Sequence, residues 1–180
     1  MSQSHSRCPA HVTLRARHGL PSLRRRDVFD AVKTALALTT TARFRLLQFN
    51  VHLLVEAEAA TALQGGVQGL AIRVAKAVNR VLRRRGRVWG DRYHALSLTT
   101  PREVRHALVY VLQNWRKHFG GVSGLDPRSS AAWFGSWRIS MTAPAEPSPV
   151  APPRTWLARA GWRRHGLVGT DETPRRGFVH

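Results

Sequence analysis

Residues 43–57 set the strongest limit on how this chain can fold, because they form the longest β-type stretch of the sequence. Apolar residues alternate along this stretch and would share one face of an extended chain, namely Leu47, Phe49, Val51, Leu53 and Val55. A single strand of this kind would extend about 50 Å, roughly three times the common length, and no Gly, Pro or Asp marks a hairpin turn inside it. The segment is therefore either one unusually long strand or a hairpin that has lost its turn.

Two amphipathic helices are predicted on either side of this segment. Ser22 is the candidate N-cap of the first helix, whose apolar residues follow the 3.6-residue period: Val28, Phe29, Val32 and Leu36. The second helix spans about residues 59–85, with Gly86 as its stop. Its apolar stripe steps by three and four through Leu63, Val67, Leu70, Val74, Val78 and Val81.

A third helix has the clearest start signal in the sequence. Thr100-Pro-Arg-Glu103 combines an N-cap hydroxyl, a proline at the first helical position and a glutamate two residues later, and it predicts a helix to about His118. Strands at residues 11–15 and 87–98 complete the order strand, helix, strand region, helix, strand, helix. This order favours an α+β fold of ferredoxin-like type, with helices packed on one face of an antiparallel sheet and a C-terminal extension.

Composition changes along the chain predict how it is divided. Residues 1–9 are expected to be a disordered N-terminus and residues 10–120 the folded domain. Residues 121–142 should dock on that domain through two tryptophans, Trp133 and Trp137. A Pro/Ala linker, extended and unpacked, is expected at 143–153, and a basic tail at 154–180.

Charge points to a polyanionic partner. The 180 residues carry 29 Lys plus Arg against 10 Asp plus Glu, a formal charge of +19. Such an excess opposes a compact state unless a polyanion neutralises it, so nucleic acid is the first partner to consider and a membrane surface the second. The apolar runs are far shorter than the roughly 20 residues that cross a bilayer, and no leader opens the sequence. We expect a cytoplasmic protein that associates with the nucleoid when it is bound to DNA.

Two groups of cations are candidates for phosphate contacts. The predicted second helix carries a cationic stripe of Arg73, Lys76, Arg80, Arg83 and Arg84. The sequence has no acid between Glu58 and Asp91 that could pair with this stripe, which favours DNA binding over an ordinary solvated face. Before the first helix stand Arg24, Arg25 and Arg26. Cations at that end oppose the helix dipole, which suggests an anionic partner, although an ordinary solvated turn is the favoured explanation.

Candidate chemistry rests on three residues. His52 is predicted in a strand, beside Asn50, and Tyr110 and Asn114 are four residues apart on the third helix. That spacing brings Tyr110 and Asn114 to one side of the helix. Taken alone, a strand histidine and a helix tyrosine are more often core residues than catalysts.

Several strings together resemble a known family. They are His11-Val-Thr-Leu-Arg15, His52-Leu-Leu-Val-Glu-Ala57, Gln68-Gly-Leu-Ala-Ile-Arg73, Asp91-Arg-Tyr-His94 and Tyr110-Val-Leu-Gln-Asn114. In this order they are similar to the REP-associated branch of the HUH single-tyrosine transposases, insertion-sequence 200-like enzymes, over about residues 10–120. Ser129-Ser-Ala-Ala-Trp-Phe134 and Thr155-Trp-Leu157 also resemble the C-terminal extension of some members.

The resemblance implies a DNA strand transferase. In the family, a tyrosine hydroxyl attacks the scissile phosphate of single-stranded, hairpin-forming DNA, and a divalent metal, Mg²⁺ or Mn²⁺, polarises that phosphate. By this resemblance Tyr110 would be the nucleophile, and His52 and Asn114 would be metal ligands. The tyrosine could serve the metal site of its own chain or that of a partner in a homodimer.

One part of the sequence departs from the family pattern. Where the family has a histidine, a hydrophobic residue and a second histidine, this chain has Asn50-Val51-His52. Either Asn50 replaces the first histidine as a weaker oxygen ligand, or about five residues have been deleted between Val51 and His52. His11 and His94, in flanking strands, are the residues that could compensate.

Three functions therefore follow from the sequence. The first is an active DNA transposase, and the second is a catalytically inactive remnant that still binds DNA hairpins. The third is an RNA-binding protein that stacks bases on its sheet. This third function is weakened because Phe44 and Phe49 fall on opposite faces of the candidate strand.

Overall fold

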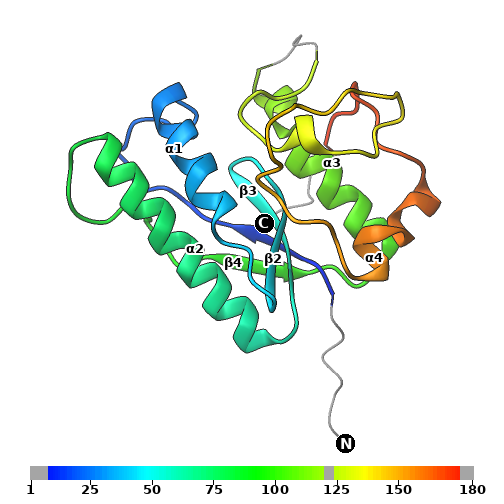
Figure 1. Cartoon of the computed structure of the whole chain (residues 1–180), viewed down its shortest axis with the longest axis horizontal. Helices are drawn as coiled ribbons and strands as arrows, with labels where there is room; N and C mark the ends of the chain where they lie inside the picture. The colour runs from blue at the N-terminus through cyan, green and yellow to red at the C-terminus, as the bar shows by residue number, and fades with distance from the viewer. Residues whose placement is uncertain (1–7, 120–123, 175–180) are drawn as a thin grey trace, which may run out of the picture.

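The computed structural model describes residues 8–119 and 124–174, and its centre is a four-stranded antiparallel sheet (Figure 1). The strands are β1 (Ala10–Thr13), β2 (Phe44–Phe49), β3 (His52–Ala57) and β4 (His94–Ser97), in the spatial order β2-β3-β1-β4. The predicted α+β class is confirmed, and the arrangement is compatible with a ferredoxin-like sheet. The ends of the chain at residues 1–7 and 175–180, which include most of the predicted disordered N-terminus and the end of the basic tail, lie outside the described residues, as do residues 120–123.

The long β-type segment is a hairpin. Only Asn50 and Val51 connect β2 to β3, and the turn is closed by the Asn50 side chain, whose Oδ1 accepts a hydrogen bond from the His52 backbone N–H at 2.6 Å. A β-bulge between Leu46 and Gln48 then rotates Leu47 to the opposite side of the sheet from Phe49. The prediction of one continuous apolar face is therefore wrong, and Val51 is exposed at the turn.

Helices α1 (Arg26–Ala37) and α2 (Ala60–Val81) pack against each other on one side of the sheet. The predicted apolar stripes form this core, with Val28, Phe29, Val67, Leu70 and Val74 among its buried residues. Ser22 is not the N-cap of α1. Its Oγ accepts a hydrogen bond from the Arg24 N–H in the turn that precedes the helix.

Helix α2 ends earlier than predicted, before the stop at Gly86. The Arg83 N–H donates to the Arg80 carbonyl and the Arg84 N–H donates to the Asn79 carbonyl, and Arg83 has a φ of +49°. This is a Schellman ending with arginine at the left-handed position that glycine usually occupies. The end of α2 could not be predicted from the sequence, because its left-handed position is occupied by an arginine and not by a glycine.

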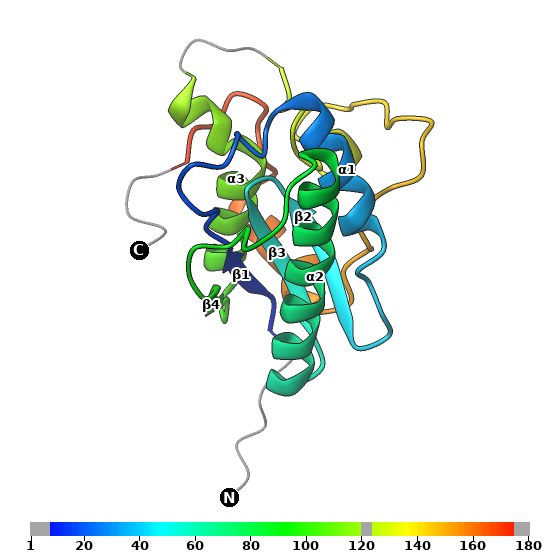
Figure 2. The same ribbon diagram turned by 90° about the vertical axis from the view of Figure 1, so that its left-hand side faces the viewer.

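Helix α3 (Pro101–His118) begins at the predicted capping box, with Thr100 accepting from the Glu103 N–H. It packs on the side of the sheet opposite α1 and α2, where it contacts Leu47 and Leu54 in a second core (Figures 1 and 2). The expectation that all helices share one face is therefore wrong. The strands bury apolar side chains on both faces, so each face needs a cover.

The C-terminal extension completes this second layer. It contains η1 (Ala131–Trp133), α4 (Trp156–Arg159) and η2 (Gly161–His165), and it buries Phe134, Trp137 and Trp162 against α3. The Pro/Ala segment was predicted to be unpacked, but it packs against the sheet. The Ala151 N–H donates to the Leu46 carbonyl at 2.8 Å, on the open edge of β2. No helix within the described residues is long and apolar enough to cross a membrane.

Candidate active site

Tyr110 and His52 meet between α3 and the sheet. Their ring centroids are 4.8 Å apart, and the Tyr110 hydroxyl is 3.5 Å from His52 Nε2. Tyr110 is only 9% exposed, because its ring lies between the middle of α3 and the sheet. The structure thus brings together two residues that are 58 positions apart in the sequence.

His11 is the third member of this cluster. Its ring stacks on that of His52 with a centroid distance of 5.2 Å and meets the Tyr110 ring edge-on at 5.6 Å. His11 comes from β1, where its neighbours Ala10 and Val12 face the other core, so the period of two turns the imidazole toward α3. Sequence reasoning treated His11 only as a compensating residue, because the pairing of β1 with β3 is a tertiary feature.

Thr13 was missed by the sequence analysis. It lies directly opposite His52 in the β1–β3 ladder, and its Oγ1 is 3.1 Å from His52 Nδ1. When Nδ1 carries the proton, it donates a hydrogen bond to Thr13 Oγ1. The other ring nitrogen, Nε2, is then an acceptor for the Tyr110 hydroxyl. The signal that could have found Thr13 is its place two residues after His11, on the same face of the same strand.

Burial controls the charge of this cluster. Burial lowers the pKa of His11 to about 4. Burial, followed by the charges of His11 and His118, lowers the pKa of His52 to about 3. Burial also raises the pKa of Tyr110. At neutral pH the site therefore contains two neutral imidazoles and a protonated phenol.

Asn114 lies on the same side of α3, one turn after Tyr110 and one turn before His118, which acts electrostatically on His52. It is 3% exposed, and its Oδ1 has no hydrogen-bond partner among the described residues. A buried carbonyl oxygen without a donor is unfavourable, so this atom is suited to accept a ligand.

Asn50 and His94 do not complete a metal site. Asn50 Oδ1 already accepts the His52 N–H within the turn, and His94 is exposed on β4. Across residues 8–119 and 124–174, no three His, Cys, Asp or Glu side chains come close enough to hold a metal ion. The donors that do fit a divalent cation are the neutral imidazole of His52 and the uncommitted oxygen of Asn114. His52 Nε2 can face either a cation or the Tyr110 hydroxyl, but not both at once.

A groove of about 580 Å³ gives access to the cluster. Tyr110 and His52 line one part of it, and it passes the β2–β3 turn toward the start of α1. Three arginines also line it: Arg15, Arg24 and Arg128. An anionic strand in this groove would be close to both the tyrosine and positive charge.

The predicted cationic stripe lies along α2 and its end. Lys76, Arg80 and Arg83 are exposed, and they form no ion pair within the part of the chain that the structure describes. Arg73 donates to the Leu38 carbonyl and Arg84 to Asn79 Oδ1, which leaves both charges without an acidic partner. This stripe therefore keeps its positive charge available for phosphate.

The arginines before α1 have a different role. Arg24 makes two hydrogen bonds, of 2.9 and 2.6 Å, to the fully buried carboxylate of Asp126. Arg25 pairs with the exposed Asp27, whose pKa is lowered to about 2, mainly by that hydrogen bond. Both guanidinium groups that were predicted to bind DNA therefore have internal carboxylate partners, and Arg24 fastens the C-terminal extension to the domain.

Comparison of the chain with models of protein families, with curated proteins and with solved structures finds no match.

Proposed function

We propose that this protein binds single-stranded, hairpin-forming DNA and cleaves and rejoins it through a phosphotyrosine at Tyr110. The observation that carries the proposal is the contact between the Tyr110 hydroxyl and His52 Nε2, at 3.5 Å. A phenol within reach of a neutral imidazole has the arrangement of a nucleophile–base pair. Arg128 in the groove and the unpaired stripe on α2 supply the charge for the DNA backbone.

Each residue of the cluster has its own role in the transfer of the DNA strand to Tyr110. The Tyr110 oxygen forms a bond to phosphorus while the bond from phosphorus to the 3′ oxygen breaks, which leaves a 5′-phosphotyrosine and a free 3′ hydroxyl. His52 Nε2 accepts the tyrosine proton and returns it to the 3′ oxygen, and Thr13 holds the ring through Nδ1. The negative phosphate raises the proton affinity of His52 above its value in the free protein. While His52 Nε2 serves as the base, Asn114 Oδ1 is the donor that remains for a divalent metal, which would supply polarisation of the phosphate.

A second function has its own support. Asn50 is committed to the turn, and the described residues contain no cluster of three metal-binding His, Cys, Asp or Glu side chains. A protein that keeps the α2 stripe and the groove without a complete metal site would bind DNA hairpins and not cut them.

One experiment separates these functions. A labelled single strand with a hairpin is incubated with the protein and Mn²⁺, and covalent adducts are resolved on a denaturing gel. We expect an adduct with the wild type and with Tyr93→Phe, the control at the only other tyrosine, and none with Tyr110→Phe. Binding without an adduct in all three proteins would favour the inactive hairpin binder. Binding that does not weaken with salt would contradict both functions, because phosphate contacts release counterions.

A further inference from the structure

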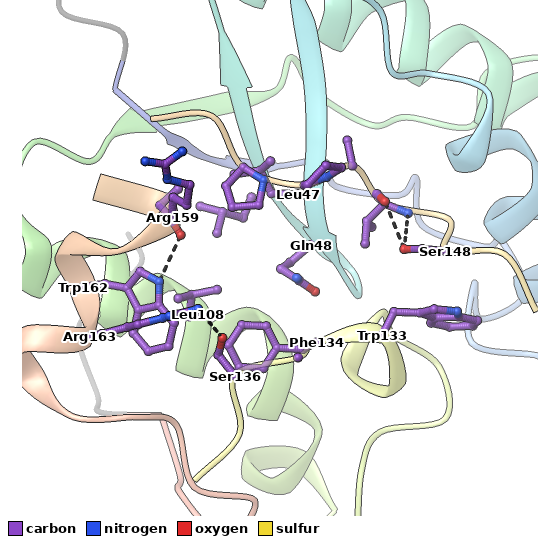
Figure 3. Close-up of a pocket in the computed structure, with 17 residues that line it drawn as sticks. Leu47, Gln48, Leu108, Trp133, Phe134, Ser136, Ser148, Arg159, Trp162 and Arg163 are labelled. Carbon is purple, nitrogen blue, oxygen red and sulfur yellow. Dashed lines mark hydrogen bonds between the residues drawn. The ribbon is translucent and has the colours of Figure 1, made fainter. Parts of the chain in front are cut away.

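A second cavity, of about 440 Å³, lies between the sheet and the C-terminal extension (Figure 3). Leu47, Leu54 and Leu108 give it an apolar floor, and Phe134 and Trp162 add aromatic rings. Pro152 and Pro153 line it as well. Of the described residues around it, none is acidic. The cavity is thus apolar, aromatic and open to an anionic ligand.

Gln48 supplies a polar group inside this cavity. The residue is 9% exposed, and Figure 3 shows its amide pointing into the space between Leu47 and Phe134. Its Oε1 accepts a hydrogen bond from Ser130 Oγ at 2.6 Å, and Ser130 Oγ in turn accepts from the Phe49 N–H. The Gln48 Nε2 has no partner among the described residues. An amide donor that faces the cavity can hydrogen-bond a ligand that presents an acceptor.

The rim of the cavity is cationic. Arg159 and Arg163 line it and are exposed, and neither forms an ion pair within the described part of the chain. Arg163 Nη2 donates to Ser136 Oγ at 2.9 Å, which holds the guanidinium at the mouth. Two guanidinium groups at the mouth of an apolar cavity are suited to the phosphates on either side of a buried ring.

We propose that this cavity binds an unpaired nucleobase of single-stranded DNA. The base would pack against Phe134 and accept a hydrogen bond from Gln48 Nε2 through a ring carbonyl, as thymine, guanine and cytosine can. Arg159 and Arg163 would contact its flanking phosphates. The inference rests on the proposed function, because it assumes that DNA is the ligand. The cavity is separate from the Tyr110 cluster, although both lie on the α3-facing side of the sheet.

The test measures base preference. Fluorescence anisotropy gives the affinity for a 5′-labelled oligothymidylate and for an abasic strand of equal length and charge, at fixed salt. We expect the wild type to prefer the thymidylate by about 5- to 100-fold, the range of one stacked base. Gln48→Met keeps the side-chain volume but removes the amide. Gly135 lines the cavity and a Cβ there meets no atom within 4 Å, so Gly135→Leu has room for a side chain designed to obstruct the mouth. Gly135→Leu should reduce the preference to less than about 2-fold, and Gln48→Met, which keeps the stacking surface, should reduce it by about 2- to 10-fold; neither should change the affinity for the abasic strand.

Ser130→Ala is the matched control, because it breaks the same Ser130–Gln48 hydrogen bond but leaves the amide in the cavity. It should keep the preference of the wild type. If Gln48→Met and Gly135→Leu both bind with an unchanged preference, the base is held elsewhere and the inference is overturned, while the adduct assay on Tyr110 still stands. If the wild type binds neither strand, DNA binding itself fails and the proposed function fails with it.

Discussion

At the scale of single residues, His52 is the centre of the candidate site because its two ring nitrogens face different partners. Nδ1 faces the Thr13 hydroxyl on β1, and Nε2 faces the Tyr110 hydroxyl on α3. The residue types in this site were predictable: Tyr110, His52 and Asn114 were found from the sequence. His11 and Thr13 were not assigned to the site, because only the strand register brings β1 beside β3.

Thr13→Val tests whether the hydroxyl positions His52. The valine has nearly the same shape but cannot accept from Nδ1–H, so the imidazole loses its fixed tautomer. We expect adduct formation to slow about 10-fold, the lower end of effects seen when a histidine loses its orienting partner. Thr13→Ser keeps the hydroxyl and should restore the rate and its pH profile. Equal rates in all three proteins would remove Thr13 from the mechanism.

The two buried histidines should make stability depend on pH. The folded pKa of His11 is about 4, below its unfolded value near 6.5, so the contribution to stability is complete above pH 6.5 and is lost as the pH falls toward 4. His11 alone should cost about 2 kcal/mol between pH 7.5 and 5. Urea unfolding with EDTA measures this loss. His11→Gln should lose correspondingly less, and an identical loss in the variant would contradict the burial of a neutral imidazole.

At the scale of elements, the β2–β3 turn and the end of α2 both lack the glycine that most often marks such positions. The β2–β3 turn is closed by an asparagine side chain, and α2 ends with an arginine in a left-handed conformation. Neither position carries the Gly, Pro or Asp signal on which sequence reasoning relied. The capped start of α3 carried its signals in full and was predicted to the residue.

Arg83→Gly should therefore stabilise the protein. A glycine at the left-handed position removes the steric cost of the arginine Cβ, and we expect a gain of about 0.5–1 kcal/mol in the free energy of unfolding. Chemical denaturation measures it. Arg85→Gly removes the same charge two residues later, where φ is not positive, and should give no gain. A gain of equal size in both variants would assign the effect to charge and not to backbone strain.

At the scale of the whole molecule, the C-terminal extension is the second half of the fold and not a tail. It covers α3 and the open edge of β2, and buried carboxylates fasten it: Asp126 binds Arg24, and Glu56 accepts from the backbone N–H groups of Arg154 and Thr155. The sequence predicted only partial docking here. Its Pro-rich composition indicates an extended chain correctly, but composition does not reveal hydrogen bonds to a distant strand.

Glu56→Ala should loosen this layer. Glu56 is 4% exposed, and its loss leaves two part-buried N–H groups without acceptors, which should cost about 2–3 kcal/mol. Glu58→Ala is the matched control, because that carboxylate is half exposed and pairs with Arg43 at 3.6 Å, so less than about 0.5 kcal/mol is expected. Urea unfolding gives both values, and trypsin cleavage after Arg154 should accelerate only in Glu56→Ala. Equal stability of the two variants would show that Glu56 does not hold the extension.

The central claim is that the Tyr110 oxygen becomes bonded to DNA. Trypsin releases this residue in the peptide 106–116, which contains one of the two tyrosines of the chain. After reaction with a hairpin strand and nuclease digestion, mass spectrometry of this peptide should find the added mass of a 5′ nucleotide on Tyr110. The account predicts that modification on the wild type and an unmodified peptide from a reaction without DNA. A modified Tyr93 peptide together with an unmodified 106–116 peptide would contradict it.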